Sequence, residues 1–127
     1  MKTILVDAIH AFVIKDEGIF NEMYEMLEQY PNKKIILTGA NDEEYERFGL
    51  GKMPYKVFTL KHNPEKTDPK YYRILLKQFN LSADDVIYFE HNGEAVESAQ
   101  SVGINTFHYN KDIKDIKALK KFLDENL

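Results

Sequence analysis

The amino-acid sequence predicts an α/β protein in which a five-stranded parallel sheet lies between two layers of helices. Short β-branched runs alternate along the chain with segments whose apolar residues recur at helical spacing. Five such strand–helix units follow one another, and right-handed crossovers place the helices on both faces of a parallel sheet. The 127 residues suit one domain without a linker or repeat. We therefore expect a Rossmann-like three-layer sandwich.

The first strand is residues 3–6 (TILV), which end at Asp7. After a loop, residues 19–30 place apolar side chains three and four positions apart. This spacing predicts an amphipathic helix, with Pro31 beyond its end. The second strand is residues 34–37.

Polar residues follow the second strand, which ends at Thr38-Gly39. Asn41 and Glu44, three positions apart, are the capping box of a short helix. Residues 57–60 then form the third strand.

The next helix begins at Asp68, which is a suitable N-cap, followed by Pro69 at the first helical position. We expect its buried stripe to be Tyr72, Leu75, Leu76 and Phe79.

The fourth strand is the continuous apolar run 86–89, followed at once by Glu90. A helix with Val96 and Ala99 facing inward then stops near Gly103, and residues 104–108 form the fifth strand. The expected inward residues of a terminal helix are Ile113, Ile116, Leu119, Phe122 and Leu123.

The charge distribution argues against generic binding to nucleic acid or an anionic membrane, because the net charge is −4. Residues 52–77 nevertheless carry a local +5, which is commonly a solvated face and also suits a phosphorylated ligand. Asp7 and His10 interrupt the apolar start of the chain, which argues against a signal peptide. No run reaches the ~20 apolar residues that a membrane span needs. Without cysteine, nothing in the sequence requires an oxidising compartment. We expect a mature, soluble, cytoplasmic protein.

Several chemically versatile side chains follow the predicted strands directly. In parallel α/β sheets, ligands bind beyond the carboxyl ends of the strands, so these side chains are expected to converge. Carboxylates, a hydroxyl and an ammonium suit Mg²⁺ and a phosphate, with Asp7 as a nucleophile. The residues are Asp7, Thr38, Gly39, Glu90, His91 and Asn92, with Lys66 in the loop before the third long helix.

Four segments, in this order, resemble the motifs of the haloacid dehalogenase (HAD) superfamily in its version with little or no cap domain. They are ILVDAIHAFV, IILTG, KTDPKYYRILLKQFNL and VIYFEHNGEAVESAQSVGI. The resemblance implies a HAD-like core over residues 1–127 and Mg²⁺-dependent hydrolysis of a phosphorylated small molecule or macromolecule. It would make Asp7 the nucleophile, Thr38 a phosphate ligand and Lys66 the balancing cation. The implied metal ligands are Asp7, Glu90, Glu94 and the backbone carbonyl of Ile9.

The sequence departs from the family pattern at Ile9. Phosphatases of the family carry a second Asp at this position, which protonates the leaving group and then activates water. Isoleucine transfers no protons, and general acid–base catalysis is typically worth ~10² to 10⁴-fold. Only 30 residues separate Asp7 from Thr38, and 27 separate Thr38 from Lys66, so no cap domain fits. We expect a slow or altered hydrolase.

His10 and His91 are the other departures, beside Asp7 and Glu90. They are either loop histidines without a role, acid–base substitutes for the missing Asp, or groups that favour a transition metal over Mg²⁺. Asn92 is a further accessory candidate.

One other reading competes with the hydrolase, and a second is excluded. A catalytically inactive HAD-like binding or regulatory module fits the same fold. A response-regulator receiver does not, because that domain phosphorylates an Asp after its third strand, and the strand here ends TLKHN. The oligomeric state stays open, although Lys56 and Lys61 would protect an exposed third strand from pairing.

Overall fold

A computed structural model describes residues 1–127, and it contains the predicted parallel sheet. Five strands are hydrogen-bonded in the order β5-β4-β1-β6-β7, and every neighbouring pair is parallel. The strands are β1 (Thr3–Asp7), β4 (Lys34–Thr38), β5 (Lys56–Thr59), β6 (Val86–Glu90) and β7 (Asn105–His108). All of these strands were expected from the sequence, and their observed bounds differ by a residue at most.

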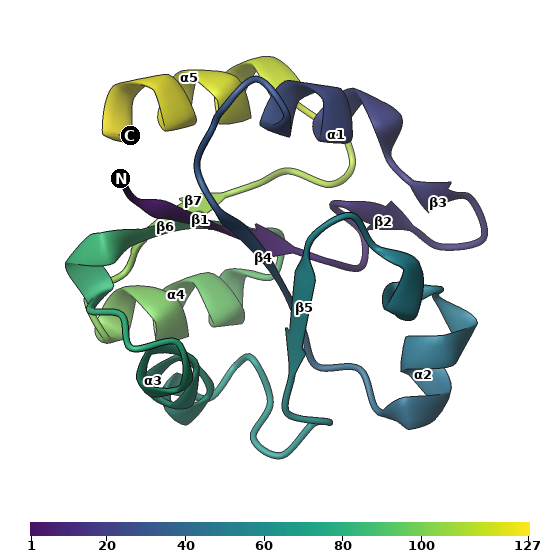
Figure 1. Ribbon diagram of the computed structural model, residues 1–127, viewed down its shortest axis with the longest axis horizontal. Coiled ribbons are helices and arrows are strands. Elements are labelled where there is room, and N and C mark those ends of the chain that lie inside the picture. Colours follow the sequence, from purple (N-terminus) through teal and green to yellow (C-terminus); the bar gives the residue numbers. More distant parts are fainter.

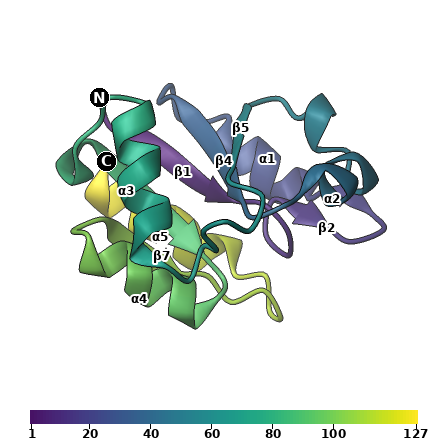
Figure 2. The same ribbon diagram turned by 90° about the horizontal axis from the view of Figure 1, so that it is seen from below.

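Helices cover both faces of the sheet, as Figure 1 shows. On one side lie α1 (Asn21–Leu27) and α5 (Ile116–Asn126), and on the other α3 (Pro69–Gln78) and α4 (Gly93–Ser101). The short α2 (Asp42–Arg47) and the 3₁₀ turns η1 (Leu50–Lys52) and η2 (Ala83–Asp85) complete the elements outside the sheets. Figure 2 shows the same arrangement from below. The predicted three-layer α/β sandwich is confirmed.

The alternating direction of side chains along β1 creates two cores. Ile4 and Val6 belong to the cluster beneath α1 and α5, whereas Leu5 belongs to the cluster beneath α3 and α4. All five residues of β1, β4 and β6 are buried, because these strands are covered on both faces. Continuous apolar runs are the expected sequence signal of such strands.

Three local predictions were wrong. Residues before Asn21 form a small antiparallel hairpin, β2 (Val13–Ile14) with β3 (Gly18–Ile19), so α1 is shorter than the predicted helix. The stripe of α3 buries Tyr71 rather than Phe79, which is only half-buried. Ile113 is exposed, because it precedes α5, whose N-cap is Asp115 and whose first residue is Ile116.

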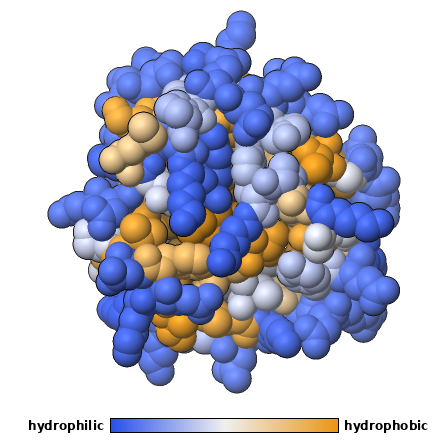
Figure 3. Space-filling model, viewed as in Figure 1, coloured by the Kyte–Doolittle hydropathy of each residue, from blue (hydrophilic) through white to orange (hydrophobic).

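Strand β5 lies at the edge of the sheet, where Figure 3 shows apolar atoms emerging among hydrophilic side chains. The ammonium of Lys56 lies 5.4 Å from the centre of the Phe79 ring and so partly covers this edge. None of the helices combines the length and the apolar composition needed to cross a membrane.

Candidate active site

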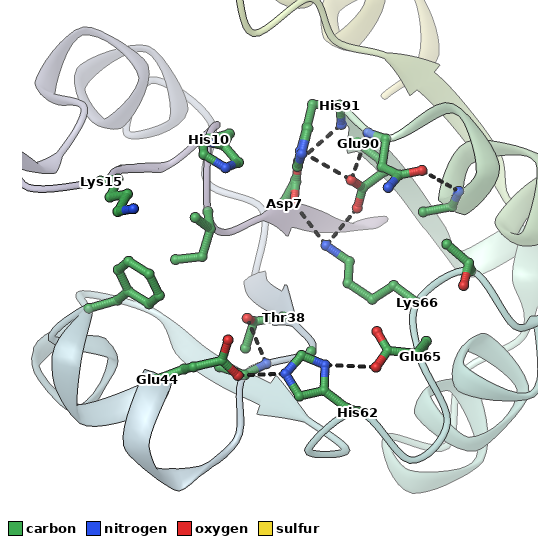
Figure 4. A pocket seen from close by; sticks show the side chains of 17 residues that line it. Asp7, His10, Lys15, Thr38, Glu44, His62, Glu65, Lys66, Glu90 and His91 are labelled. Atoms are coloured by element: carbon green, nitrogen blue, oxygen red, sulfur yellow. Dashed lines mark hydrogen bonds and ion pairs between the residues drawn. The ribbon is translucent and has the colours of Figure 1, made fainter.

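A pocket of about 400 Å³ opens where β1, β4 and β6 end at the carboxyl edge of the sheet. Most of the predicted site residues line it. Figure 4 shows Asp7, Glu90 and Lys66 on one side of the pocket and Thr38 on the other. The lining includes Asp7, Ile9, His10, Thr38, Lys66, Glu90, His91 and Asn92.

Asp7 is the last residue of β1 and only 1% exposed, yet it is ionised. Its Oδ1 accepts a hydrogen bond from Lys66 Nζ at 2.8 Å, and its Oδ2 accepts one from the backbone N–H of His91 at 3.0 Å. Burial raises the pKa of Asp7, but the charge of Lys66 and the hydrogen bond from the His91 ring outweigh burial and lower it to about 2. The carboxylate is therefore available as a nucleophile or ligand at neutral pH.

Glu90 ends β6 beside Asp7 and is equally buried. Its Oε1 lies 2.6 Å from Lys66 Nζ and accepts a hydrogen bond from the Tyr88 hydroxyl. Its Oε2 accepts a hydrogen bond from the Asn92 N–H at 3.0 Å. Burial, and then the nearby charge of Asp7, raise the pKa of Glu90.

Lys66 bridges the two buried carboxylates from the loop that precedes α3. Its Nζ also donates to the Leu37 carbonyl at 3.3 Å, and 14% of its side chain is exposed. Burial alone would lower the pKa of Lys66, but Asp7 and Glu90 hold it well above its ordinary value. One fixed positive charge thus faces two buried negative charges.

His91 lies on the other side of the same two carboxylates. Its Nδ1 contacts Asp7 Oδ2 and lies 3.2 Å from Glu90 Oε2. Burial is the largest single influence and lowers the pKa of His91, but the hydrogen bond to Asp7 and the charges of Asp7 and Glu90 together raise it above its ordinary value. The His10 ring packs edge to face against the His91 ring, with 5.3 Å between the ring centroids. Burial, and then the charge of His91, lower the pKa of His10.

Thr38 ends β4 and is buried in the pocket wall. Its Oγ1 accepts a hydrogen bond from the Ala40 N–H at 3.1 Å, so its own hydroxyl proton is available for a bound anion. Asn92 caps α4 by accepting from the N–H groups of Glu94 and Ala95.

One of the proposed metal ligands, Glu94, lies away from the other three. Ile9 lines the pocket, but Glu94 does not. Glu94 is exposed on the outer side of α4, because Ala95, Val96 and Ala99 of that helix face inward. We correct the expectation that Glu94 belongs to the acidic cluster.

Sequence reasoning missed a second cluster in the pocket, formed by Glu44, His62 and Glu65. His62 Nε2 lies 2.5 Å from Glu44 Oε1, and its Nδ1 lies 2.8 Å from Glu65 Oε1. The hydrogen bond to Glu44 is the largest of the interactions that raise the pKa of His62. The ring packs against Gly39, where an added Cβ would lie 3.3 Å from Nδ1. Only Glu44 carried a sequence signal, as a helix cap.

The donor atoms beside Asp7 fit a divalent cation. Asp7, Glu90 and His91 each offer one atom, and these three atoms lie within 4.8 Å of one another. Two of them are carboxylate oxygens, the ligands that Mg²⁺ prefers, and the third is an imidazole nitrogen.

The sequence matches no family model and no curated protein. Solved structures nevertheless identify the fold. An uncharacterized protein from Corynebacterium glutamicum has a TM-score of 0.63 and 13% identity, over 98% of this chain and 96% of its own. A haloacid dehalogenase-like protein of unknown function from Agrobacterium tumefaciens has a TM-score of 0.61 and 15% identity, over 84% of this chain and 62% of its own.

A third solved structure is a HAD family enzyme from Bacteroides thetaiotaomicron, a variant in complex with magnesium and inorganic phosphate. Its TM-score is 0.51 at 13% identity, over 72% of this chain and 51% of the enzyme. The chain therefore has a HAD-like fold, and it spans about half of this enzyme's length.

Proposed function

We propose that this chain is a HAD-like hydrolase that transfers a phosphoryl group to Asp7 and then to water. The observation that carries the proposal is the pairing of a buried, ionised Asp7 with Lys66 and Glu90 at the carboxyl edge of the sheet. A HAD-like neighbour binds magnesium and inorganic phosphate, which supports the same class of ligand here.

The atoms of Asp7 have separable tasks in this proposal. Oδ1 accepts only the Lys66 hydrogen bond, which leaves a lone pair for attack on phosphorus. Oδ2 and Glu90 Oε2 lie on the His91 side and would hold a divalent cation, Mg²⁺ by analogy with the fold neighbour, together with the Ile9 carbonyl. Such a cation neutralises charge on the phosphoryl oxygens when it is bound.

The reaction would proceed in two displacements. Attack by Asp7 Oδ1 forms an oxygen–phosphorus bond while the bond to the leaving oxygen breaks, giving an acyl phosphate. Water then attacks the same phosphorus, the bond to Oδ1 breaks, and inorganic phosphate leaves. Lys66 and the hydroxyl of Thr38 would hold the phosphoryl oxygens.

Ile9 gives the reaction no acid or base, although it lines the pocket where such a group would act. His10 also lines the pocket, and its lowered pKa keeps it neutral at pH 7. We propose that His10 or solvent takes over part of the proton transfer. The position of Ile9 also supports the alternative, a module that binds a phosphorylated ligand or partner without turnover.

The test uses two phosphate esters with Mg²⁺. p-Nitrophenyl phosphate releases a stable anion, whereas an alkyl phosphate needs its leaving oxygen protonated. We expect wild-type turnover on the aryl ester, no turnover by Asp7→Asn, and an Ile9→Asp variant about 10²-fold faster on the alkyl ester. Absence of turnover on both esters by folded wild type and folded Ile9→Asp would favour the binding module.

A further inference from the structure

We propose that His91 is a metal ligand, and that the site formed by Asp7, Glu90 and His91 binds Zn²⁺, Co²⁺ and Mn²⁺ more tightly than Mg²⁺. The inference rests on the cation site of the proposed function and not on hydrolysis itself. It goes further by naming a nitrogen ligand and the class of ion that this ligand selects.

The two carboxylates present different atoms to their two neighbours. Lys66 Nζ binds Asp7 Oδ1 at 2.8 Å and Glu90 Oε1 at 2.6 Å. The remaining oxygens, Asp7 Oδ2 and Glu90 Oε2, both lie next to His91 Nδ1. The acid pair thus has one side for a lysine and a separate side on which two oxygens and one nitrogen converge (Figure 4).

Hydrogen bonds hold the two carboxylate oxygens and the backbone of His91 in place. Backbone N–H groups donate to both oxygens, from His91 to Asp7 Oδ2 and from Asn92 to Glu90 Oε2. The backbone carbonyl of His91 accepts a hydrogen bond from His108 Nε2 at 2.9 Å. Outer hydrogen bonds of this kind orient metal ligands and raise affinity.

The chemistry of the donors selects the ion. Mg²⁺ favours oxygen ligands and retains its water shell, so an imidazole nitrogen adds little to its binding. Imidazole suits Zn²⁺ and its neighbours, and affinity for a mixed site rises from Mn²⁺ through Co²⁺ in the order typical of divalent transition ions. Without His91, the same two carboxylates would form an ordinary Mg²⁺ site.

The structure separates the two histidines that the sequence left equivalent. The His91 ring contacts both carboxylates, whereas no hydrogen bond or ion pair joins the His10 ring to either one. The His10 ring instead packs edge to face against His91. His10→Ala is therefore the matched control for His91→Ala.

The experiment measures binding of Mg²⁺, Mn²⁺, Co²⁺ and Zn²⁺ to the full chain by titration calorimetry. We expect wild type to bind Co²⁺ and Zn²⁺ at least about tenfold more tightly than Mg²⁺. His91→Ala should abolish this preference by weakening Co²⁺ and Zn²⁺ binding about tenfold or more, with Mg²⁺ binding changed less than about threefold. His10→Ala should keep the preference for Co²⁺ and Zn²⁺ over Mg²⁺, because the His10 ring offers no ligand atom to the site.

A second measurement needs no variant. Nitrogen NMR of the wild-type imidazoles should show the His91 Nδ1 resonance shifting on addition of Zn²⁺, with a smaller change at His62. Equal affinities for Mg²⁺ and Co²⁺, no metal binding at all, or an unshifted His91 resonance in the Zn²⁺-bound protein would overturn the inference. Selective Zn²⁺ binding without ester turnover would uphold it and reject the hydrolase instead.

Discussion

Replacing Lys66 by methionine should expose the electrostatic cost of the two buried acids. The change keeps the length of the side chain and removes the charge that contacts Asp7 at 2.8 Å and Glu90 at 2.6 Å. The pKa of Asp7 falls from 3.8 to about 2 in the folded protein, which corresponds to about 2 kcal/mol because one pKa unit is about 1.4 kcal/mol. In the Lys66→Met variant, Glu90 also loses its ion pair with Lys66.

We expect Lys66→Met to lower the free energy of unfolding by about 3–5 kcal/mol near pH 7, the usual cost of removing one member of a buried ion pair. Asp7 normally contributes stability that is complete above pH 3.8 and is lost as the pH falls towards 2. In the variant, the unpaired carboxylates take up protons at higher pH. The deficit should therefore shrink as the pH approaches 4.5, the ordinary pKa of a glutamate.

Urea unfolding of wild type and variant at both pH values measures the deficit. Lys70→Met is the matched control, since Lys70 is exposed and makes no ion pair. Adding Asp7→Asn to Lys66→Met should recover part of the loss, because one buried charge then disappears. A deficit below about 1 kcal/mol near pH 7, or an equal deficit at the two pH values, would refute the account.

Three smaller predictions concern groups around the site. The Tyr109 hydroxyl is buried without a partner, so Tyr109→Phe should be neutral or stabilising in urea unfolding, whereas Tyr71→Phe, which loses a 2.7 Å hydrogen bond, should cost about 1 kcal/mol. The pKa of His62 is raised in the folded protein, so this residue contributes stability that is complete below its ordinary pKa of 6.5 and is lost as the pH rises through the folded pKa. Because its side chain is 39% exposed, His62→Gln should remove less than about 1 kcal/mol of this pH-dependent stability. Urea unfolding of wild type and variant at about pH 6 and about pH 9 measures the difference. Asn41→Ala breaks the capping box of α2 and should cost about 1 kcal/mol of unfolding free energy, with a loss near zero contradicting the cap.

The sequence determined the sheet and the position of the edge at which the candidate site lies. Parallel strands buried on both faces are continuous apolar runs, so β1, β4 and β6 could be recognised from composition alone. Because their carboxyl ends share one edge, Asp7, Thr38 and Glu90 could be assigned to one pocket. The two-residue strands of the β2–β3 hairpin are too short for a periodicity, and they were missed.

Only the tertiary structure decided how individual side chains around that edge are used. Glu94 follows Glu90 at a plausible spacing, but the packing of α4 turns it outward, because the small apolar residues of the same helix occupy the inner face. His10 and His91 were equivalent in sequence, and folding brings only His91 to both acids. His62 reaches the pocket from a loop whose path no local pattern specifies. Side-chain direction depends on contacts between segments far apart in the chain, and such contacts leave no periodic signal in the sequence.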